Sequence, residues 1–340
     1  MKKIVRAENI GINRKPEVIN MNESTRKGQK KLVSKRWQKK QGLLLVGIII
    51  IVALVGMLKN AEKMEAVKEA DNRQIKVAEE KNEKIKTIST VSCERVYTEF
   101  YMNHMPQNLE DSQVYDALEK LAGEYPEFQD VYENRENYPI ELLAALCNNP
   151  EMLAYVEGYA KYRNGDKTVA GQAELTTQEK EKRFPLFLQW DKQWGYEEYG
   201  DFNIALSGCG PTCLSMVLVA QNRDFDMTPD KVADFAMENN FYVEGTGTAW
   251  SLMTDGARQL GLEAKEISLD ESVMKNQLDM GKMMICSVRP GDFTALGHFI
   301  VIYGYDDNGF LVNDPNNIYR SNRSWTYEEL ASQIRILWSY

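Results

Sequence analysis

Residues 207–218 read Ser207-Gly208-Cys209-Gly210-Pro211-Thr212-Cys213-Leu214-Ser215-Met216-Val217-Leu218. The stretch predicts a helix that starts at Cys209, because proline suits the first helical turn and an apolar run follows it. The first turn of a helix offers unpaired N–H groups and the positive end of the helix dipole, which together stabilise a thiolate. Cys209 is therefore the candidate nucleophile. Its flanking glycines are expected to let the backbone turn tightly and approach a substrate, and Cys213, one turn further on, is expected to pack inside.

A nucleophilic thiol also needs a base. His298 opens the apolar run Gly297-His298-Phe299-Ile300-Val301-Ile302-Tyr303-Gly304-Tyr305, which predicts a strand with the ring projecting from its end. A third group should orient the imidazole, and the favoured candidate is Asp314 in Val312-Asn313-Asp314-Pro315. Asn313 is the alternative, because side chains alternate along a strand and only one of the two can face the ring.

Four stretches, taken together, resemble the C39-like peptidase family. They are Phe187-Leu188-Gln189-Trp190-Asp191-Lys192-Gln193-Trp194-Gly195, Gly208-Cys209-Gly210-Pro211-Thr212, Gly297-His298-Phe299 and Asn313-Asp314-Pro315. The resemblance covers residues 183–340 and implies an α+β, papain-like cysteine peptidase domain with N-terminal helices packed on an antiparallel sheet. It implies the role of nucleophile for Cys209, base for His298 and orienting partner for Asp314.

The same resemblance implies that Gln189 donates to the oxyanion beside the backbone N–H of Cys209. Gln193, or a surface role for both glutamines, stays open as the alternative.

The order of elements from residue 183 onward is typical of an α+β domain, with helices first and strands later. Helices are predicted over 209–221, 229–239, 249–260 and 271–280, with caps at Thr228, Thr248 and Asp270. Strands are predicted over 283–288, 298–305, 310–313 and 335–339. Asp306-Asp307-Asn308-Gly309 predicts a hairpin turn, and Thr326-Tyr327-Glu328-Glu329 predicts a capping box.

Residues 42–58 are 17 consecutive apolar residues without a charge, which predicts one transmembrane helix. Lysines and arginines crowd its N-terminal side, so the positive-inside rule keeps the basic tail, residues 1–41, in the cytoplasm. The expectation is a bacterial, single-pass protein of the cell membrane, anchored in the lipid bilayer, with its catalytic domain extracytoplasmic. A cleaved signal peptide and a buried core helix are the alternatives.

Between the apolar run and the C39-like region the sequence predicts three further parts. Residues 59–90, rich in Glu, Lys and Ala, predict a helical stalk, residues 91–165 a small all-helical segment, and residues 166–182 a linker. The helices of the segment are predicted over 113–122, 127–134, 139–147 and 150–161. Its many aromatic residues are expected to be core rather than a peptide-binding strip.

Charge and motifs exclude several classes of function. Thirteen Lys or Arg and three acidic residues in 1–41, against a formal net charge of −9, leave −19 for the rest of the chain, which argues against nucleic acid as a partner. Gly245-Thr246-Gly247-Thr248 lacks the lysine of a phosphate loop and predicts a turn before the next helix instead. Neither zinc nor calcium spacing occurs, so no metal and no cofactor is expected.

The sequence says less about the roles of the remaining cysteines and of the other histidine. The five cysteines are an odd number, so at least one is expected to be free outside the cell, while pairing of Cys93 with Cys147 stays open. His104 has no cysteine or carboxylate at ligand spacing, which favours a surface or capping role.

The function expected is thiol-dependent hydrolysis of a peptide or amide bond in a peptide or protein substrate, through a thioester. An acyl transferase on the same scaffold and a non-catalytic surface binding module are the alternatives. Members of the wider family that trim bacteriocin leaders are fused to an ATP-driven exporter. The chain has no phosphate-binding loop, so that substrate is not expected.

Overall fold

The computed structural model describes residues 93–340. The predicted basic tail 1–41, transmembrane helix 42–58 and stalk 59–90 lie outside the described residues. Among the residues that are described, none of the helices is both long and apolar enough to cross a bilayer. The described residues, 93–340, belong to one compact unit, while the boundaries of the segment, linker and C39-like domain stay predictions.

Residues 93–163, called the helical segment below, consist of short helices around their own core. They are α2 (Cys93–Asn103), α3 (Asp111–Glu124), α4 (Gln129–Glu133), α5 (Ile140–Asn148) and α6 (Leu153–Arg163), with one-turn 3-10 helices at Pro126–Phe128, Arg135–Asn137 and Pro150–Met152. The side chain of Asn149 accepts the backbone N–H of Glu151, and Pro150 occupies the position where no N–H is needed. Phe128 and Tyr155 are fully buried, so the expectation that the aromatic residues form core is confirmed.

The predicted linker, residues 166–182, contains only two short helical pieces. They are a 3-10 turn at Lys167–Val169 and α7 (Thr177–Glu181). Thr176 starts α7 in a capping box with Glu179, each side chain satisfying a backbone N–H of the other's turn.

The C-terminal region is built on one six-stranded antiparallel sheet in the order β5-β10-β6-β7-β8-β9. The strands are β5 (Lys265–Ile267), β6 (Met284–Val288), β7 (His298–Asp306), β8 (Gly309–Asn313), β9 (Ser324–Trp325) and β10 (Ile334–Ser339). The four predicted strands are all present, and the predicted hairpin joins β7 to β8. The two edge strands, β5 and β9, have no predicted counterpart because three and two residues are too few to show a period.

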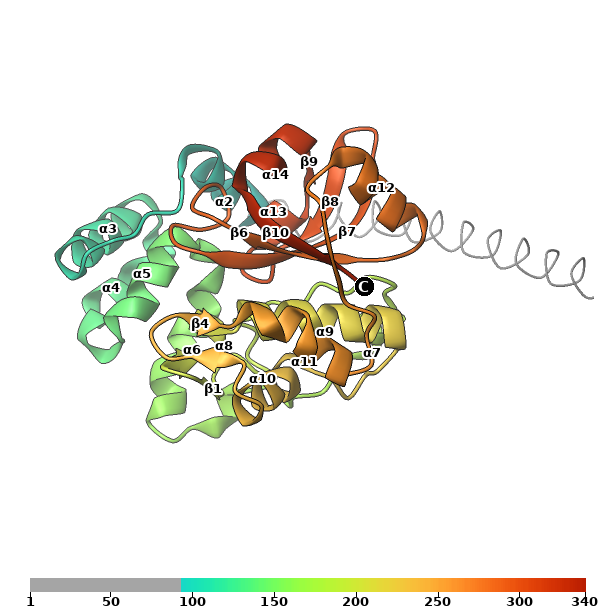
Figure 1. Ribbon diagram of the computed structural model, residues 1–340. Coiled ribbons are helices and arrows are strands. Elements are labelled where there is room, and N and C mark those ends of the chain that lie inside the picture. The colour runs from blue at the N-terminus through green and yellow to red at the C-terminus, as the bar shows by residue number, and fades with distance from the viewer. Residues whose placement is uncertain (1–92) are drawn as a thin grey trace, which may run out of the picture. The chain divides into compact units, whose positions relative to one another are not determined.

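Helices cover both faces of this sheet (Figure 1). On one side lie α9 (Cys209–Asn222), α10 (Pro229–Glu238) and α11 (Asp255–Gln259), and on the other α12 (Glu271–Asp279) and α14 (Tyr327–Gln333). Alternate strand residues belong to the two cores, since Ile285 packs in the cluster with α9 while Met284 packs in the cluster with α12. The predicted caps Asp270 and Thr326 both accept backbone N–H groups at the starts of α12 and α14. The α+β expectation is confirmed.

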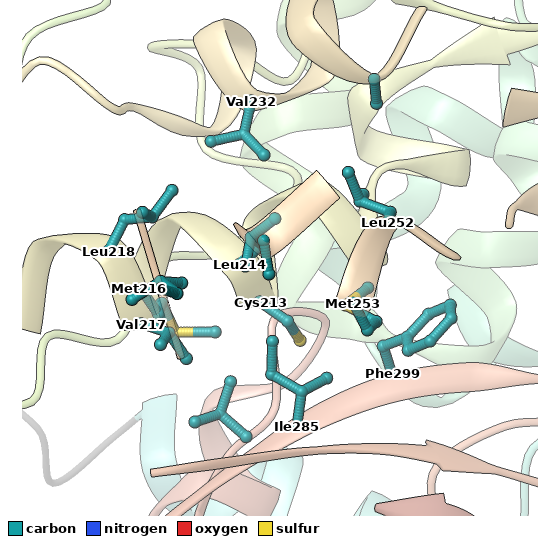
Figure 2. Packing of buried hydrophobic residues seen from close by; sticks show 14 of the residues in the cluster. Cys213, Leu214, Met216, Val217, Leu218, Val232, Leu252, Met253, Ile285 and Phe299 are labelled. Atoms are coloured by element: carbon teal, nitrogen blue, oxygen red, sulfur yellow. The ribbon is translucent and has the colours of Figure 1, made fainter. Parts of the chain in front are cut away.

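Helix α9 is buried along most of its length. Every residue from Gly210 to Val219 is buried, as expected for a helix that is apolar on all sides. Cys213 packs against Ile285 and Phe299 of the sheet (Figure 2). The expectation that Cys213 lies inside is therefore confirmed.

The glycines beside Cys209 lie in tightly packed positions. A Cβ on Gly208 would lie 2.5 Å from Ile204 Cγ2, and a Cβ on Gly210 would lie 2.7 Å from Thr248 Cγ2. Both glycines are thus required by close packing against the protein itself, and the expectation that they let the backbone approach a substrate stays a prediction.

The single helix predicted over 249–260 is also wrong. The structure has a 3-10 helix at Trp250–Met253 followed by α11, and the break falls at Thr254. Thr254 and Gly256 are both poor helix formers. Thr248 is not a cap, because it lies in the strand pair β3 (Tyr242–Val243) and β4 (Gly247–Thr248) that frames the predicted turn.

Two further small elements precede α9. The strands β1 (Glu198–Tyr199) and β2 (Phe202–Asn203) form a second hairpin, and α8 (Ile204–Ser207) leads from it directly into α9. The helix α13 (Ile318–Ser321) follows β8.

Candidate active site

Cys209 lies at the first position of α9, half-buried and with a free thiol. It lines a cleft of about 420 Å³ together with Gln189 and His298. The preceding turn, α8, delivers the chain to this point, since the backbone N–H of Gly208 donates to Ile204 O at 2.8 Å. The thiol therefore faces a cavity of the size that ordinary ligand sites have.

His298 begins β7 and is buried, with 8% of its surface exposed. Its Nε2 lies 2.8 Å from Oδ1 of Asp314. Because a carboxylate only accepts hydrogen bonds, Nε2 carries the proton of this contact. Cys209 lines the same cleft as His298, and its charge is among the causes that raise the pKa of the ring.

Asp314 follows β8 directly and is fully buried. Its Oδ1 accepts the backbone N–H of Asn316 at 2.8 Å, and its Oδ2 lies 3.3 Å from Nη1 of Arg320. Burial alone would raise the pKa of the Asp314 carboxyl, but His298 and Arg320 outweigh burial and hold it below its usual value. The carboxylate is therefore anionic where it meets the imidazole.

The alternative Asn313 has a different partner. Its Nδ2 donates to Pro185 O at 3.0 Å, which fastens the end of β8 to the chain that leads into the region. The strand alternation thus sends Asp314 toward His298 and Asn313 away from it.

The charge state of His298 depends on opposing effects. Burial of the ring lowers the pKa of His298, but the negative charges of Asp314 and Cys209 and the hydrogen bonds to both outweigh burial and raise the pKa to about 10. An imidazolium at neutral pH follows, placed between two groups that are negative when ionised.

Gln189 is buried in the cleft lining, with its backbone held by a 2.7 Å bond to Pro315 O. Its Nε2 donates to Ala205 O at 2.7 Å, which uses one of the two amide protons. The structure thus brings Gln189 to Cys209, whereas Gln193 is not among the described residues that line this cleft.

Arg320 was not a candidate in the sequence, although it is buried against the site. It donates from Nη1 to Phe293 O at 3.1 Å as well as to Asp314. A buried arginine requires a carboxylate partner. Arg320 and Asp314 are six positions apart, a spacing that is not typical of any pair within a helix or strand, so the sequence did not indicate their contact.

Side chains of the helical segment hold the loop that carries Asp314. Glu151 accepts the backbone N–H groups of Ile318 at 2.7 Å and Tyr319 at 3.0 Å. Asn149, which is 1% exposed, donates from Nδ2 to Asn316 O and accepts from Asn317 Nδ2. These pairs are separated by about half the chain, so no local sequence pattern predicts them.

The aromatic and thiol groups of the helical segment are not part of the chemistry. His104 is half-buried, stacks on Phe100 and lies 3.3 Å from Asn148 Oδ1. Cys147 is a free, buried thiol whose Sγ faces Val114 O. Within residues 97–340 no group of three or more His, Cys, Asp or Glu side chains is arranged to hold a metal ion.

Residues 181–340 match the family model described as Peptidase_C39 like family. This region is C39-like. The resemblance predicted from the four sequence motifs is confirmed for this region. No curated protein matches the chain.

Two solved structures are similar to part of this chain. One is the peptidase domain of Streptococcus ComA, described as a bi-functional ABC transporter involved in a quorum sensing pathway, with 21% identity, 43% of this chain and 96% of that chain covered, and a TM-score of 0.32. The other is a putative C39-like peptidase from Bacillus anthracis, with 15% identity, 46% and 94% covered, and a TM-score of 0.29.

Proposed function

We propose that this protein hydrolyses a peptide or amide bond through a thioester on Cys209. The observation that carries the proposal is that Cys209 from α9 and His298 from β7 line one cleft, while Asp314, after β8, is buried against His298. A nucleophile, a base and a carboxylate that orients the base are the parts that acyl transfer needs.

Acylation begins from the pair of Cys209 thiolate and His298 imidazolium. The thiolate sulfur attacks the carbonyl carbon, and a tetrahedral oxyanion forms. The carbon–nitrogen bond then breaks, the imidazolium gives its proton to the leaving amine, and the acyl group remains on sulfur as a thioester. Asp314, anionic and buried, keeps the ring oriented while this proton leaves.

The oxyanion requires donors at the start of α9. The backbone N–H of Cys209 belongs to the first turn, whose N–H groups have no partner within the helix. The second amide proton of Gln189 is the other donor that we assign, since Gln189 lines the same cleft and Ala205 uses only one proton.

Deacylation reverses the proton movement. Neutral His298 takes a proton from water as the oxygen attacks the thioester carbon. The carbon–sulfur bond breaks, the carboxylic acid leaves, and the thiolate and imidazolium return. An amine in place of water would give acyl transfer instead.

The test is incubation of the purified protein with a mixture of peptides, followed by mass spectrometry of products and of the intact protein. New carboxyl termini, and a mass increase on Cys209 when the reaction is quenched in acid, are expected with wild type and not with Cys209→Ala. Products joined to an added amine would indicate a transferase, and an unchanged mixture would overturn the proposal in favour of a binding module.

A spectroscopic test addresses the ion pair. The chain has two histidines, so NMR titration of the imidazole signals needs only one assignment. Cys209→Ala removes a negative neighbour and should lower the pKa of His298, while His104, whose pKa burial already lowers, should not move.

We also propose that residues 42–58 anchor the protein in the cell membrane with residues after 58 outside the cytoplasm, because the apolar run follows a strongly basic tail. In cells of the source organism, the protein should stay in the membrane fraction after alkaline extraction. External protease should degrade the C-terminal region in intact cells. Recovery in the soluble fraction would contradict the anchor.

A further inference from the structure

The cleft around Cys209 has two walls of different origin. One comes from the loop before β7, including Phe293 and Leu296, within the region that matches the C39-like family. The other comes from residues 106–148 of the helical segment, which lie outside that match. Almost half of the described residues that line the cleft belong to this second wall.

The second wall is held rigidly against the catalytic elements. Glu151 and Asn149, at the end of α5 and in the turn after it, bind the loop 316–319 through the hydrogen bonds given above. Trp190, beside Gln189, donates from Nε1 to the same Asn316 O at 2.8 Å. The helical segment and Trp190 thus bind the same loop, residues 316–319, which follows Asp314.

The lining of the second wall has a definite chemistry. Its aliphatic members are Leu109, Val114, Ile140, Ala144 and Ala145. Leu296, which is 65% exposed, extends the apolar surface on the opposite side. Contact with an aliphatic side chain would remove this surface from water.

Charge adds a second requirement. Asp111 and Glu141, both exposed, line the same wall. Among the described residues of the lining, the cations are Arg320 and the imidazolium of His298, and both are already paired with Asp314. The cleft therefore presents uncompensated negative charge beside an apolar surface.

We infer that the helical segment is the specificity wall of the active site and selects peptides with an aliphatic side chain next to the scissile bond and a cationic residue close to it. The inference rests on the proposed peptidase function for the identity of the site. The helical segment thus gives the enzyme a preference among peptide substrates that the C39-like region lacks by itself.

Binding tests the inference without catalysis. In the full chain carrying Cys209→Ala, fluorescence anisotropy compares two short labelled peptides, one with Leu followed by Lys and one with Gly followed by Glu at the same positions. The Leu-Lys peptide is expected to bind at least about tenfold more tightly, since one aliphatic side chain in an apolar pocket gives that order of discrimination.

Variants of the wall then locate the preference. Ala144→Leu should occupy the aliphatic space and reduce the preference for Leu by about tenfold. Asp111→Asn should reduce the preference for Lys a few-fold, and Asp116→Asn, on the same helix but not among the cleft-lining residues, should change neither. Equal binding of both peptides, or a preference that survives both wall variants, would overturn the inference.

Turnover separates this inference from the proposed function. If the Leu-Lys peptide binds selectively but wild type cleaves no peptide, the hydrolase proposal fails and the inference about the helical segment stands. If wild type cleaves both peptides with equal kcat/KM, the hydrolase stands and the wall is wrong. Alkylation of Cys209 by iodoacetamide at the same rate in wild type and Ala144→Leu shows that the substitution leaves the thiol accessible.

Discussion

The helical segment and the C39-like region each contain a histidine and at least one free cysteine, but only in the latter do these residues meet. His298 hydrogen-bonds Asp314 and lines one cleft with Cys209, whereas His104 stacks on Phe100 and Cys147 is buried in an apolar core. Burial raises the pKa of the Cys147 thiol to about 12. Reactive residue types are therefore not enough; a thiol needs a cleft and a charged partner.

The helical segment nevertheless supports the active site of the C39-like region. All the groups proposed for the chemistry come from residues 189–314, yet the loop after Asp314 is held by Asn149 and Glu151 of the helical segment. The region that does no chemistry thus stabilises the geometry of the region that does.

The largest effect is expected from the two cysteines of α9. Cys209→Ala should reduce turnover by ~10⁴-fold or more, because no other group forms the thioester, and should leave the melting temperature nearly unchanged. Cys213→Ala, deep in the core, should keep turnover and lose about 1 kcal/mol of stability. Turnover with a peptide substrate and thermal unfolding measure both, and a similar loss of turnover in both variants would contradict the assignment.

Asp314→Asn should lower kcat by about 100-fold or more, because it removes the charge that orients and stabilises the imidazolium. The substitution also leaves Arg320 buried without its carboxylate. Asp307→Asn, in the exposed hairpin turn, is the matched control and should behave like wild type. Equal activity of the two variants would show that Asp314 is only structural.

A smaller effect is expected at Asn149. Asn149→Ala should reduce the free energy of unfolding by about 1–3 kcal/mol, since buried partners on residues 316 and 317 lose their hydrogen bonds. Chemical denaturation measures this, with Asn134→Ala, an exposed position bonded only within its own helix turn, as the control. A neutral Asn149→Ala would mean that the two regions are held together by other contacts.

The smallest effect is a pH dependence at Glu151. Burial raises the pKa of Glu151 to about 7, against hydrogen bonds from the α13 backbone that lower it. Between pH 4.5 and 7 the folded state then binds more protons at this group than the unfolded state, so its contribution to stability falls as pH rises.

Glu151→Gln should remove this dependence of stability on pH. The change in the free energy of unfolding should be less than about 2 kcal/mol, because solvent screens a half-buried group. Denaturation curves at pH 4.5 and pH 7 compare the variant with wild type. If the stability of the variant and of wild type changes equally with pH, another group is responsible for the pH dependence.

Local patterns were sufficient for most of the elements of the C-terminal region. The start of α9, the capping of α12 and α14 and the hairpin between β7 and β8 each depend on residues within one turn or one strand. Where the prediction was wrong, at 249–260, a 3-10 helix ends at Thr254 and a separate short helix, α11, follows it.

The sequence by itself determined that Cys209 stands at a helix start, that His298 opens an apolar strand, and that Asp314 follows the next strand, because capping, periodicity and spacing are short-range properties. Only the tertiary structure decided that Arg320 neutralises Asp314, that Asn149 and Glu151 fasten its loop, and that residues 106–148 wall the cleft. These contacts join parts of the chain whose sequence separation leaves no periodic trace, and they form only when the two cores pack together.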